Sequence, residues 1–182
     1  MNLSDRPRLR LLTLCALYLV QGIPTGFVTI TLAAFLAERG ASAAQIATFV
    51  AVGWLPWGVK LFFGPLVDRF AHSAMGRRRP WILGAEAGMI TVLATMIAVP
   101  DLADRLLVLT GLVFVGNLFN ALQDVATDGM AVDLLRPEER GLANGAMWSA
   151  KILGIAIGGA GMSTVMASSG LRAALTVQLT FT

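Results

Sequence analysis

The sequence predicts an all-α integral membrane protein, and three observations support this fold class. Of the 182 residues, 56% are hydrophobic and 14% are charged, whereas soluble domains have roughly 25% charged residues. The apolar residues form long runs, and a helix needs about 20 such residues to cross a bilayer core. Arginines are concentrated in the short segments between these runs, as they are in the cytoplasmic loops of membrane proteins.

Six helical segments are expected, of which five are long enough to cross a membrane and the last is incomplete. They span residues 11–37, 44–67, 81–99, 106–130, 142–167 and 171–182. The first is interpreted as a membrane helix because its uncharged run exceeds the roughly 7–15 residues of a signal-peptide h-region. Residues 1–10 before it are predicted to form a cytoplasmic tail.

Glycine and proline mark the irregular points of these segments. In the first two, residues 22–26 and 53–58 each contain a proline flanked by glycines. Such breaks are tolerated in lipid where neighbouring helices or a water-lined cavity satisfy the freed backbone groups, although an ordinary kink without a role is the alternative. The fifth segment carries Gly154, Gly158 and Gly161 on roughly one face, which predicts close helix packing.

The distribution of arginine predicts the orientation, since Lys and Arg are retained on the cytoplasmic side. Arginines are frequent in the tail, between the second and third segments and between the fourth and fifth, at positions 6, 8, 10, 69, 77, 78, 79, 136 and 140. The opposite loops contain only Arg39, Arg105 and Arg172. The N-terminus is therefore predicted to be cytoplasmic, in a multi-pass protein of the inner (plasma) membrane.

Five ionisable residues lie inside the expected membrane segments: Lys60, Glu86, Asp124, Asp128 and Lys151. With this topology all five fall in the cytoplasmic half, about one to two helical turns deep. A charge near the bilayer centre costs roughly 2.5–3.5 kcal/mol, so most of them must pair, titrate or face water. Two cations and three carboxylates at similar depth can neutralise one another, and a structural ion pair is the expected role of Glu86.

Asp124 and Asp128 share one face of the fourth segment because they are four residues apart. Other polar residues extend the fourth segment and line the first: Asn117, Asn120, Gln123, Gln21, Thr25 and Thr29. The two polar stripes predict a hydrated path between these helices. In the alternative interpretation Asp124 is a packing carboxylate locked to Lys151 or Lys60, and Lys60 extends to the membrane surface.

The sequence disfavours several other functions. Cys15 is the single cysteine and His72 the single histidine, so neither an intrachain disulfide nor a metal site is expected. The net charge of +3 comes mostly from loop arginines, which indicates membrane orientation and not nucleic-acid binding. Asp124 and Asp128 lie on the same helix and cannot face each other as a protease dyad. We therefore expect neither an enzyme nor a cofactor.

One loop carries a family resemblance. Residues 64–69, which read Gly-Pro-Leu-Val-Asp-Arg, and residues 76–79, which read Gly-Arg-Arg-Arg, resemble the signature between helices 2 and 3 of the major facilitator superfamily. The longer spacing at residues 70–75 is typical of its peptide–acetyl-coenzyme A–drug transporter branch, which includes the AmpG-type muropeptide permeases. Further stretches are similar to the same branch, at residues 17–24, 54–69, 123–128 and 138–141.

The resemblance implies a transporter that works by alternating access and is usually driven by protons. Members have about twelve helices in two halves with the substrate between them, so this chain is expected to supply the N-terminal six-helix bundle, with the sixth helix truncated. Asp128 matches a protonation site. The signature itself implies a cytoplasmic gate, formed here by Gly64, Asp68, Arg69, Gly76, Arg77 and Arg78.

The leading hypothesis is therefore a proton-coupled transporter of a small solute, such as a muropeptide-like or other anionic conjugate. The residues expected on its proton and substrate pathway are Asp124, Asp128, Lys60, Lys151, Gln21 and Asn120. The expected partners are the small-molecule substrate, protons, the lipid bilayer, and a missing C-terminal half or second copy. Two alternatives stay open: a non-transporting half-size protein that binds a solute or partner, and a membrane-embedded enzyme. Muropeptides, acyl-coenzyme A compounds, drugs and sugar conjugates all remain candidate substrates.

Overall fold

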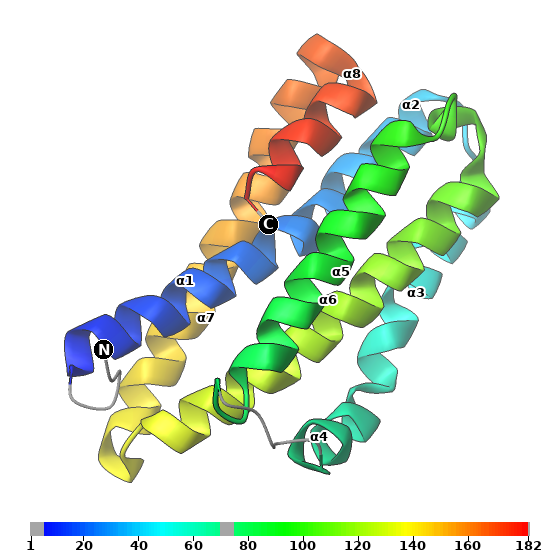
Figure 1. Ribbon diagram of the computed structural model, residues 1–182. Coiled ribbons are helices and arrows are strands. Elements are labelled where there is room, and N and C mark those ends of the chain that lie inside the picture. Colours follow the sequence, from blue (N-terminus) through cyan, green and yellow to red (C-terminus); the bar gives the residue numbers. More distant parts are fainter. Residues whose placement is uncertain (1–5, 70–74, 182) are drawn as a thin grey trace.

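A computed structural model describes residues 6–69 and 75–181, which form a bundle of long helices (Figure 1). Within this described part there is no strand, which confirms the all-α class. Residues 1–5, 70–74 and 182 lie outside the described residues. Part of the predicted tail, most of the lengthened loop, His72 and the last residue of the predicted sixth segment are therefore not placed.

The first membrane helix is longer than its apolar run. It consists of α1 (Pro7–Gly26), a π-helical segment (Phe27–Leu32) and α2 (Ala33–Glu38). Proline suits the first helical turn, where its missing N–H needs no partner, so the helix already begins at Pro7. Arg10, predicted for the tail, is instead helical and buried, with Nη2 lying 2.6 Å from Oε2 of Glu139.

The second predicted helix is interrupted. It consists of α3 (Ala43–Gly58), which starts with a capping box between Ser42 and Gln45, and α4 (Lys60–Arg69). Pro56 cannot donate a backbone hydrogen bond and Gly58 is a poor helix former, so the helix ends there. After this break α4 turns away from the axis of α3 (Figure 1).

The remaining helices are α5 (Arg79–Ala98), α6 (Leu106–Leu134), α7 (Arg140–Ala156), a π-helical segment (Ile157–Gly161) and α8 (Met162–Leu179). Inside α8, Gly170 has φ 79° and ψ 178°, a left-handed conformation that glycine adopts without steric cost. The chain reverses at this residue, and the segment after it runs back along the bundle (Figure 1).

Five stretches of the described chain are long and apolar enough to cross a membrane: Pro7–Glu38, Ala43–Arg69, Arg79–Ala98, Leu106–Leu134 and Pro137–Leu179. The predicted fifth and sixth segments are joined in the last stretch because Gly170 turns the chain without a loop. Many large apolar side chains are exposed on the bundle, among them Leu61, Phe62, Leu107 and Leu142. An apolar exterior is what a lipid environment requires. The protein is therefore a multi-pass membrane protein.

Glycines allow α1 and α7 to approach each other closely. A Cβ at Gly154 or Gly158 would lie 2.1 or 1.9 Å from a backbone carbonyl oxygen of α1, and one at Gly22 would lie 2.2 Å from a carbonyl oxygen of α7. This confirms the predicted close packing at Gly154 and Gly158. Gly161 does not take part, because the nearest atom to its Cβ would be 3.9 Å away.

The two π-helical segments lie against each other at the level of Thr31. Its hydroxyl oxygen is 2.8 Å from the carbonyl oxygens of Gly158 and Gly159 and 3.0 Å from the hydroxyl of Ser163. A π-helical turn leaves carbonyl groups without their usual partner along the helix, and a buried carbonyl needs a donor. The Thr31 hydroxyl supplies that donor and fixes the relative position of the two long helices.

Candidate functional site

Four helices bring four charged side chains and a tyrosine together, and we call this group the cleft cluster: Tyr18 of α1, Lys60 of α4, Asp124 and Asp128 of α6, and Lys151 of α7. The Nζ of Lys151 lies 3.0 Å from Oδ1 of Asp124. Lys60 donates to the other oxygen of Asp124, and its Nζ lies 3.1 Å from Oδ2 of Asp128. The Tyr18 hydroxyl donates to Asp128. Positive and negative groups therefore alternate, as their similar depth in the membrane predicts.

Burial divides the cleft cluster into an inner and an outer pair. The side chains of Asp124 and Lys151 are 3% and 7% exposed, whereas those of Lys60 and Asp128 are 32% and 43% exposed. The inner pair is thus largely buried at the base of the cluster and must stay paired, since removing one partner of a buried pair costs about 3–5 kcal/mol. Asp128 is the carboxylate that water and solutes reach. Lys60 bridges both aspartates.

Aromatic rings surround the lysines of the cleft cluster. The Nζ of Lys151 lies 4.8 Å from the ring centroid of Trp57, 5.4 Å from that of Tyr18 and 5.5 Å from that of Trp148. Lys60 also lies over Trp57, at 5.8 Å. These distances are within cation–π range, so the rings help to stabilise the buried ammonium group and present flat apolar faces beside it.

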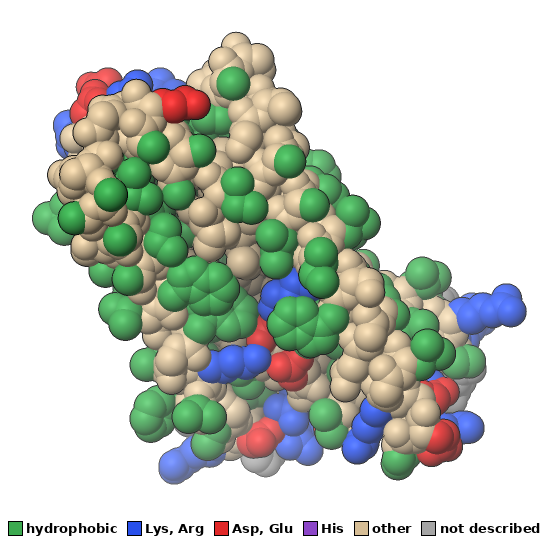
Figure 2. Space-filling model, turned by 180° about the vertical axis from the view of Figure 1, so that it is seen from behind, with side chains coloured by type: hydrophobic (Ala, Val, Ile, Leu, Met, Phe, Trp, Pro, Cys, Tyr) green, Lys and Arg blue, Asp and Glu red, His purple; other side chains and the backbone are tan. Residues whose placement is uncertain are grey.

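The cleft cluster lines an open cleft of about 590 Å³. Figure 2 shows one face of the molecule, on which charged side chains gather in a hollow between large hydrophobic side chains. Arg140, Asn144 and the two tryptophans contribute further walls. A volume of this size admits a small molecule, and the lining offers cations, an accessible carboxylate and aromatic faces.

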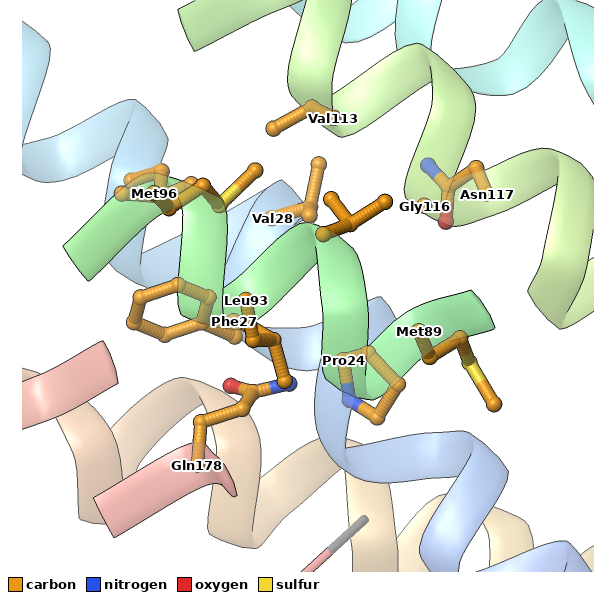
Figure 3. A pocket seen from close by; sticks show the side chains of 12 residues that line it. Pro24, Phe27, Val28, Met89, Leu93, Met96, Val113, Gly116, Asn117 and Gln178 are labelled. Atoms are coloured by element: carbon orange, nitrogen blue, oxygen red, sulfur yellow. The ribbon is translucent and has the colours of Figure 1, made fainter. Parts of the chain in front are cut away.

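A second cavity, in the interior, is much smaller. Apolar side chains such as Met89, Leu93 and Val113 line it together with the amides of Asn117 and Gln178 (Figure 3). Its volume of about 40 Å³ holds a few water molecules at most. This interior cavity is therefore too small for a solute of the size that the open cleft admits.

A chain of amides leads from the cleft cluster into the bundle. Lys151 Nζ donates to Oε1 of Gln21 at 3.1 Å, and Nε2 of Gln21 donates to Oε1 of Gln123. Nε2 of Gln123 in turn donates to Oε1 of Glu86 at 2.8 Å. The predicted ion pair of Glu86 is wrong for the described residues, because the face of α5 that carries Glu86 meets an amide of α6 and no cation.

The remaining residues of the two polar stripes have different hydrogen-bond partners. The hydroxyls of Thr25 and Thr29 donate to carbonyl oxygens one turn earlier in α1, so they are satisfied within their own helix. Asn117 donates to the carbonyl oxygen of Gly53 at 2.8 Å. Asn120 is 1% exposed, and neither of its amide atoms has a hydrogen-bond partner in the described part.

The gate signature forms a second ionic group, which we call the loop cluster: Asp68 at the end of α4, Arg77, Arg78, and Asp133 on α6. Oδ1 of Asp68 lies 3.1 Å from Nη2 of Arg77 and 2.6 Å from Nη1 of Arg78. Nε of Arg78 lies 3.1 Å from Oδ2 of Asp133. Arg78 therefore joins α4 to α6 at this end of the bundle.

Three residues of the signature, Gly64, Arg69 and Gly76, are not members of the loop cluster as defined above. Gly76 has φ 94°, which favours glycine where the chain enters α5. Arg69 is the last residue of α4. Gly64 is open on α4, with no atom within 4 Å of the place a Cβ would occupy, so packing among the described residues does not explain this glycine. By contrast, a Cβ at Gly129 of α6 would lie 2.6 Å from the guanidinium carbon of Arg78.

Sequence reasoning missed Tyr18, Trp57, Trp148 and Asp133 as members of these sites. Tyr18 could have been found, because it lies three residues before Gln21 and therefore on the same face of the helix. Trp57 lies three residues before Lys60 and Trp148 three before Lys151, which is the same signal. Asp133 lies near the end of α6, where a solvated carboxylate is unremarkable in sequence.

The described chain combines an apolar exterior, a cleft lined by paired charges and an ionic group at one end of the bundle, and comparison with known proteins places it among the membrane transporters. The family model described as acetyl-coenzyme A transporter 1 matches residues 10–166. The chain belongs to this family. The predicted resemblance to the branch of peptide, acetyl-coenzyme A and drug transporters is confirmed, and the family and named relatives are transporters and permeases, not enzymes.

Individual relatives agree with this assignment. A Rickettsia conorii protein named "Putative transporter AmpG 4" is 32% identical over 159 residues, which cover 84% of this chain and 37% of the relative. The anhydromuropeptide permease of Escherichia coli is 28% identical over 141 residues, which cover 78% of this chain and 28% of the permease. The chain thus spans about a third of the length of these relatives. No solved structure matches it significantly.

Proposed function

We propose that this chain forms the N-terminal six-helix bundle of a proton-coupled transporter of the major facilitator type, which works by alternating access. The segment after Gly170 starts the sixth crossing, and the N-terminus lies on the cytoplasmic side of the inner (plasma) membrane. A second bundle, from the C-terminal part of a longer chain or from a second copy, completes the pathway. The arginine distribution and the length of the relatives support this arrangement.

The cleft fits a small anionic conjugate that also carries a ring. Lys60, Lys151 and Arg140 supply positive charge, and Arg140 suits the flat geometry of a carboxylate or phosphate. Trp57 and Trp148 offer faces on which a sugar or base ring stacks. The names of the family and of the Escherichia coli relative describe acetyl-coenzyme A and an anhydromuropeptide, and both compounds combine anionic groups with rings.

The observation that carries the coupling proposal is the position of Asp128. Its carboxylate is shared between Lys60 and Tyr18, and it is 43% exposed toward the cleft. A proton arriving from the cleft removes its charge, and Lys60 then keeps Asp124 as its single carboxylate in the described residues. The bond between α4 and α6 is weakened, which shifts the equilibrium between two conformations.

The sparse packing of α4 makes this helix the element that would move between the two conformations. Val67 is the one buried residue of α4, so ion pairs carry much of its contact with α6. Lys60 holds one end through the cleft cluster, and Asp68 holds the other through Arg78 and Asp133. These two positions are about 12 Å apart along the helix. Movement of α4 would therefore change the cleft cluster and the loop cluster together.

The test is uphill uptake into vesicles containing the protein at its full native length. Labelled anhydromuropeptide is the first probe and labelled acetyl-coenzyme A the second, with an imposed inward proton gradient. Wild type is expected to accumulate one of them, and Asp128→Asn to lose accumulation while keeping downhill exchange. Asp104→Asn is the matched control, because Asp104 forms an exposed ion pair with Arg39. Accumulation by Asp128→Asn would overturn the coupling role, and binding without flux would favour a non-transporting protein.

A further inference from the structure

The carboxyl group of Glu86 is the one ionisable group of the predicted membrane set that the proposed function leaves unused. We propose that Glu86 is a second proton-carrying carboxyl group, placed at the inner end of the Lys151–Gln21–Gln123 hydrogen-bond chain and linked through it to the cleft cluster. This inference rests on the proposed proton coupling, because it adds a second proton site to the same transporter.

The surroundings of Glu86 favour the protonated form. Oε1 accepts one hydrogen bond, from the amide of Gln123 at 2.8 Å. Oε2 is buried and has no hydrogen-bond partner among residues 6–69 and 75–181. Burying an ionised carboxylate without a cation costs far more than burying the neutral acid. Glu86 therefore holds a proton on Oε2 in this conformation.

Charged and titratable groups on the neighbouring helices do not neutralise Glu86. α6 and α8 pack against α5, and α1 and α7 reach it through the amide chain. The ionisable side chains of these four helices are Arg8, Arg10, Cys15, Tyr18, Asp124, Asp128, Asp133, Arg140, Lys151 and Arg172. In the described part none of them forms an ion pair with Glu86, and the first cation along the hydrogen-bond chain is Lys151, two amides away.

The amide chain links the proton on Glu86 to the inner ion pair. Gln123 donates to Glu86 and accepts from Gln21, which in turn accepts from Lys151. If Glu86 lost its proton, the new carboxylate would attract Lys151 and compete with Asp124 for it. Hydrogen-bond chains in a low dielectric transmit such changes because their members polarise one another. Loss of the proton from Glu86 therefore weakens the ion pair between Lys151 and Asp124.

The small interior cavity, which holds a few water molecules at most, begins about one helical turn from Glu86 along α5. The small interior cavity is lined by Met89, three residues after Glu86 on α5, and by Asn117 on α6. Asn120, one turn further along α6, has a buried amide without a partner among the described residues. Buried polar groups of this kind are usually satisfied by ordered water or by a partner in another conformation.

Infrared spectroscopy of the purified full-length protein tests this inference. A protonated carboxyl band at neutral pH is expected in wild type, lost in Glu86→Gln, and kept in Glu86→Asp and in Asp128→Asn. Labelling glutamate with 13C moves the band in wild type if it comes from a glutamate, and leaves it unmoved in Glu86→Asp, where residue 86 is an unlabelled aspartate. This comparison assigns the band to residue 86 even if Glu86→Gln does not fold. Raising the pH is expected to remove the band, and addition of anhydromuropeptide, or of acetyl-coenzyme A if that is the transported probe, is expected to shift or abolish it.

The outcomes separate this inference from the proposed function. Absence of a protonated glutamate band in wild type would overturn the Glu86 site, whatever the transport assay shows. A band that neither pH nor the transported probe changes would make Glu86 a static structural acid and overturn its carrying role. A responsive band together with unimpaired uphill uptake by Asp128→Asn would overturn the Asp128 coupling step and leave the Glu86 site standing.

Discussion

Replacement of Asp124 by asparagine is expected to destabilise the bundle strongly, because it leaves Lys151 buried without a carboxylate. The two side chains are 3% and 7% exposed, and Lys151 Nζ lies 3.0 Å from Asp124 Oδ1. Asparagine keeps the shape of aspartate but supplies no negative charge. Breaking a buried pair in this way costs about 3–5 kcal/mol. The aromatic rings around Lys151 offset part of this cost and place the expected value at the lower end.

Thermal unfolding in detergent measures the effect, with tryptophan fluorescence as the signal. One kcal/mol corresponds to a shift in Tm of about 2–4 °C for chains of 150–250 residues. At the lower end, about 3 kcal/mol, the expected loss for Asp124→Asn is therefore about 6–12 °C. The double variant Asp124→Asn with Lys151→Met removes both charges and is expected to recover part of the loss, because no unpaired ion remains.

Asp128→Asn is the matched control on the same helix. The side chain of Asp128 is 43% exposed, and an exposed ion pair contributes roughly 0–1 kcal/mol. Its Tm is therefore expected to fall by less than about 4 °C. Equal losses for Asp124→Asn and Asp128→Asn, or no recovery in the double variant, would refute the division of the cleft cluster into a buried inner pair and an accessible outer pair.

Three further predictions follow from individual contacts. Gly158→Ala places a Cβ 1.9 Å from a backbone oxygen of α1 and is expected to lower Tm, whereas Gly145→Ala, with no atom within 4 Å, is expected to stabilise by up to about 1 kcal/mol. Thr31→Val removes the hydroxyl between the π-helical segments, with an expected cost of about 1–3 kcal/mol in the same assay. Arg78→Lys loses the geometry that joins two aspartates and is expected to slow uptake of the transported probe more than Arg77→Lys. Equal effects within either matched pair would contradict the contacts.

The sequence predicts which charged residues lie at one level of the bundle better than the direction in which their side chains point. The level of a residue along its helix follows from hydropathy and helix rise. This level correctly predicts that Lys60, Asp124, Asp128 and Lys151 form ion pairs with one another. The lateral direction depends on how each helix is rotated about its axis, which packing against its neighbours determines. For this reason Glu86, at similar depth, is expected among ions but meets the amide of Gln123.

Local irregularities were predicted in part. The glycines of the fifth segment indicate close packing, and the structure shows it at Gly154 and Gly158. The paired π-helical segments could not be foreseen, because they depend on a hydroxyl of one helix meeting carbonyl groups of another. The break between α3 and α4 was signalled by Pro56 and Gly58, but the change of direction that brings Lys60 to Asp124 depends on tertiary packing.

Proton entry driven by the solute tests the central claim most directly. The full-length protein is reconstituted into vesicles that contain a pH-sensitive dye, and the transported probe is added outside without an imposed gradient. Our account predicts acidification of the lumen with wild type and with Asp104→Asn, and loss of this signal with Asp128→Asn. Entry of the probe into wild-type vesicles at constant lumenal pH would contradict proton coupling at the cleft.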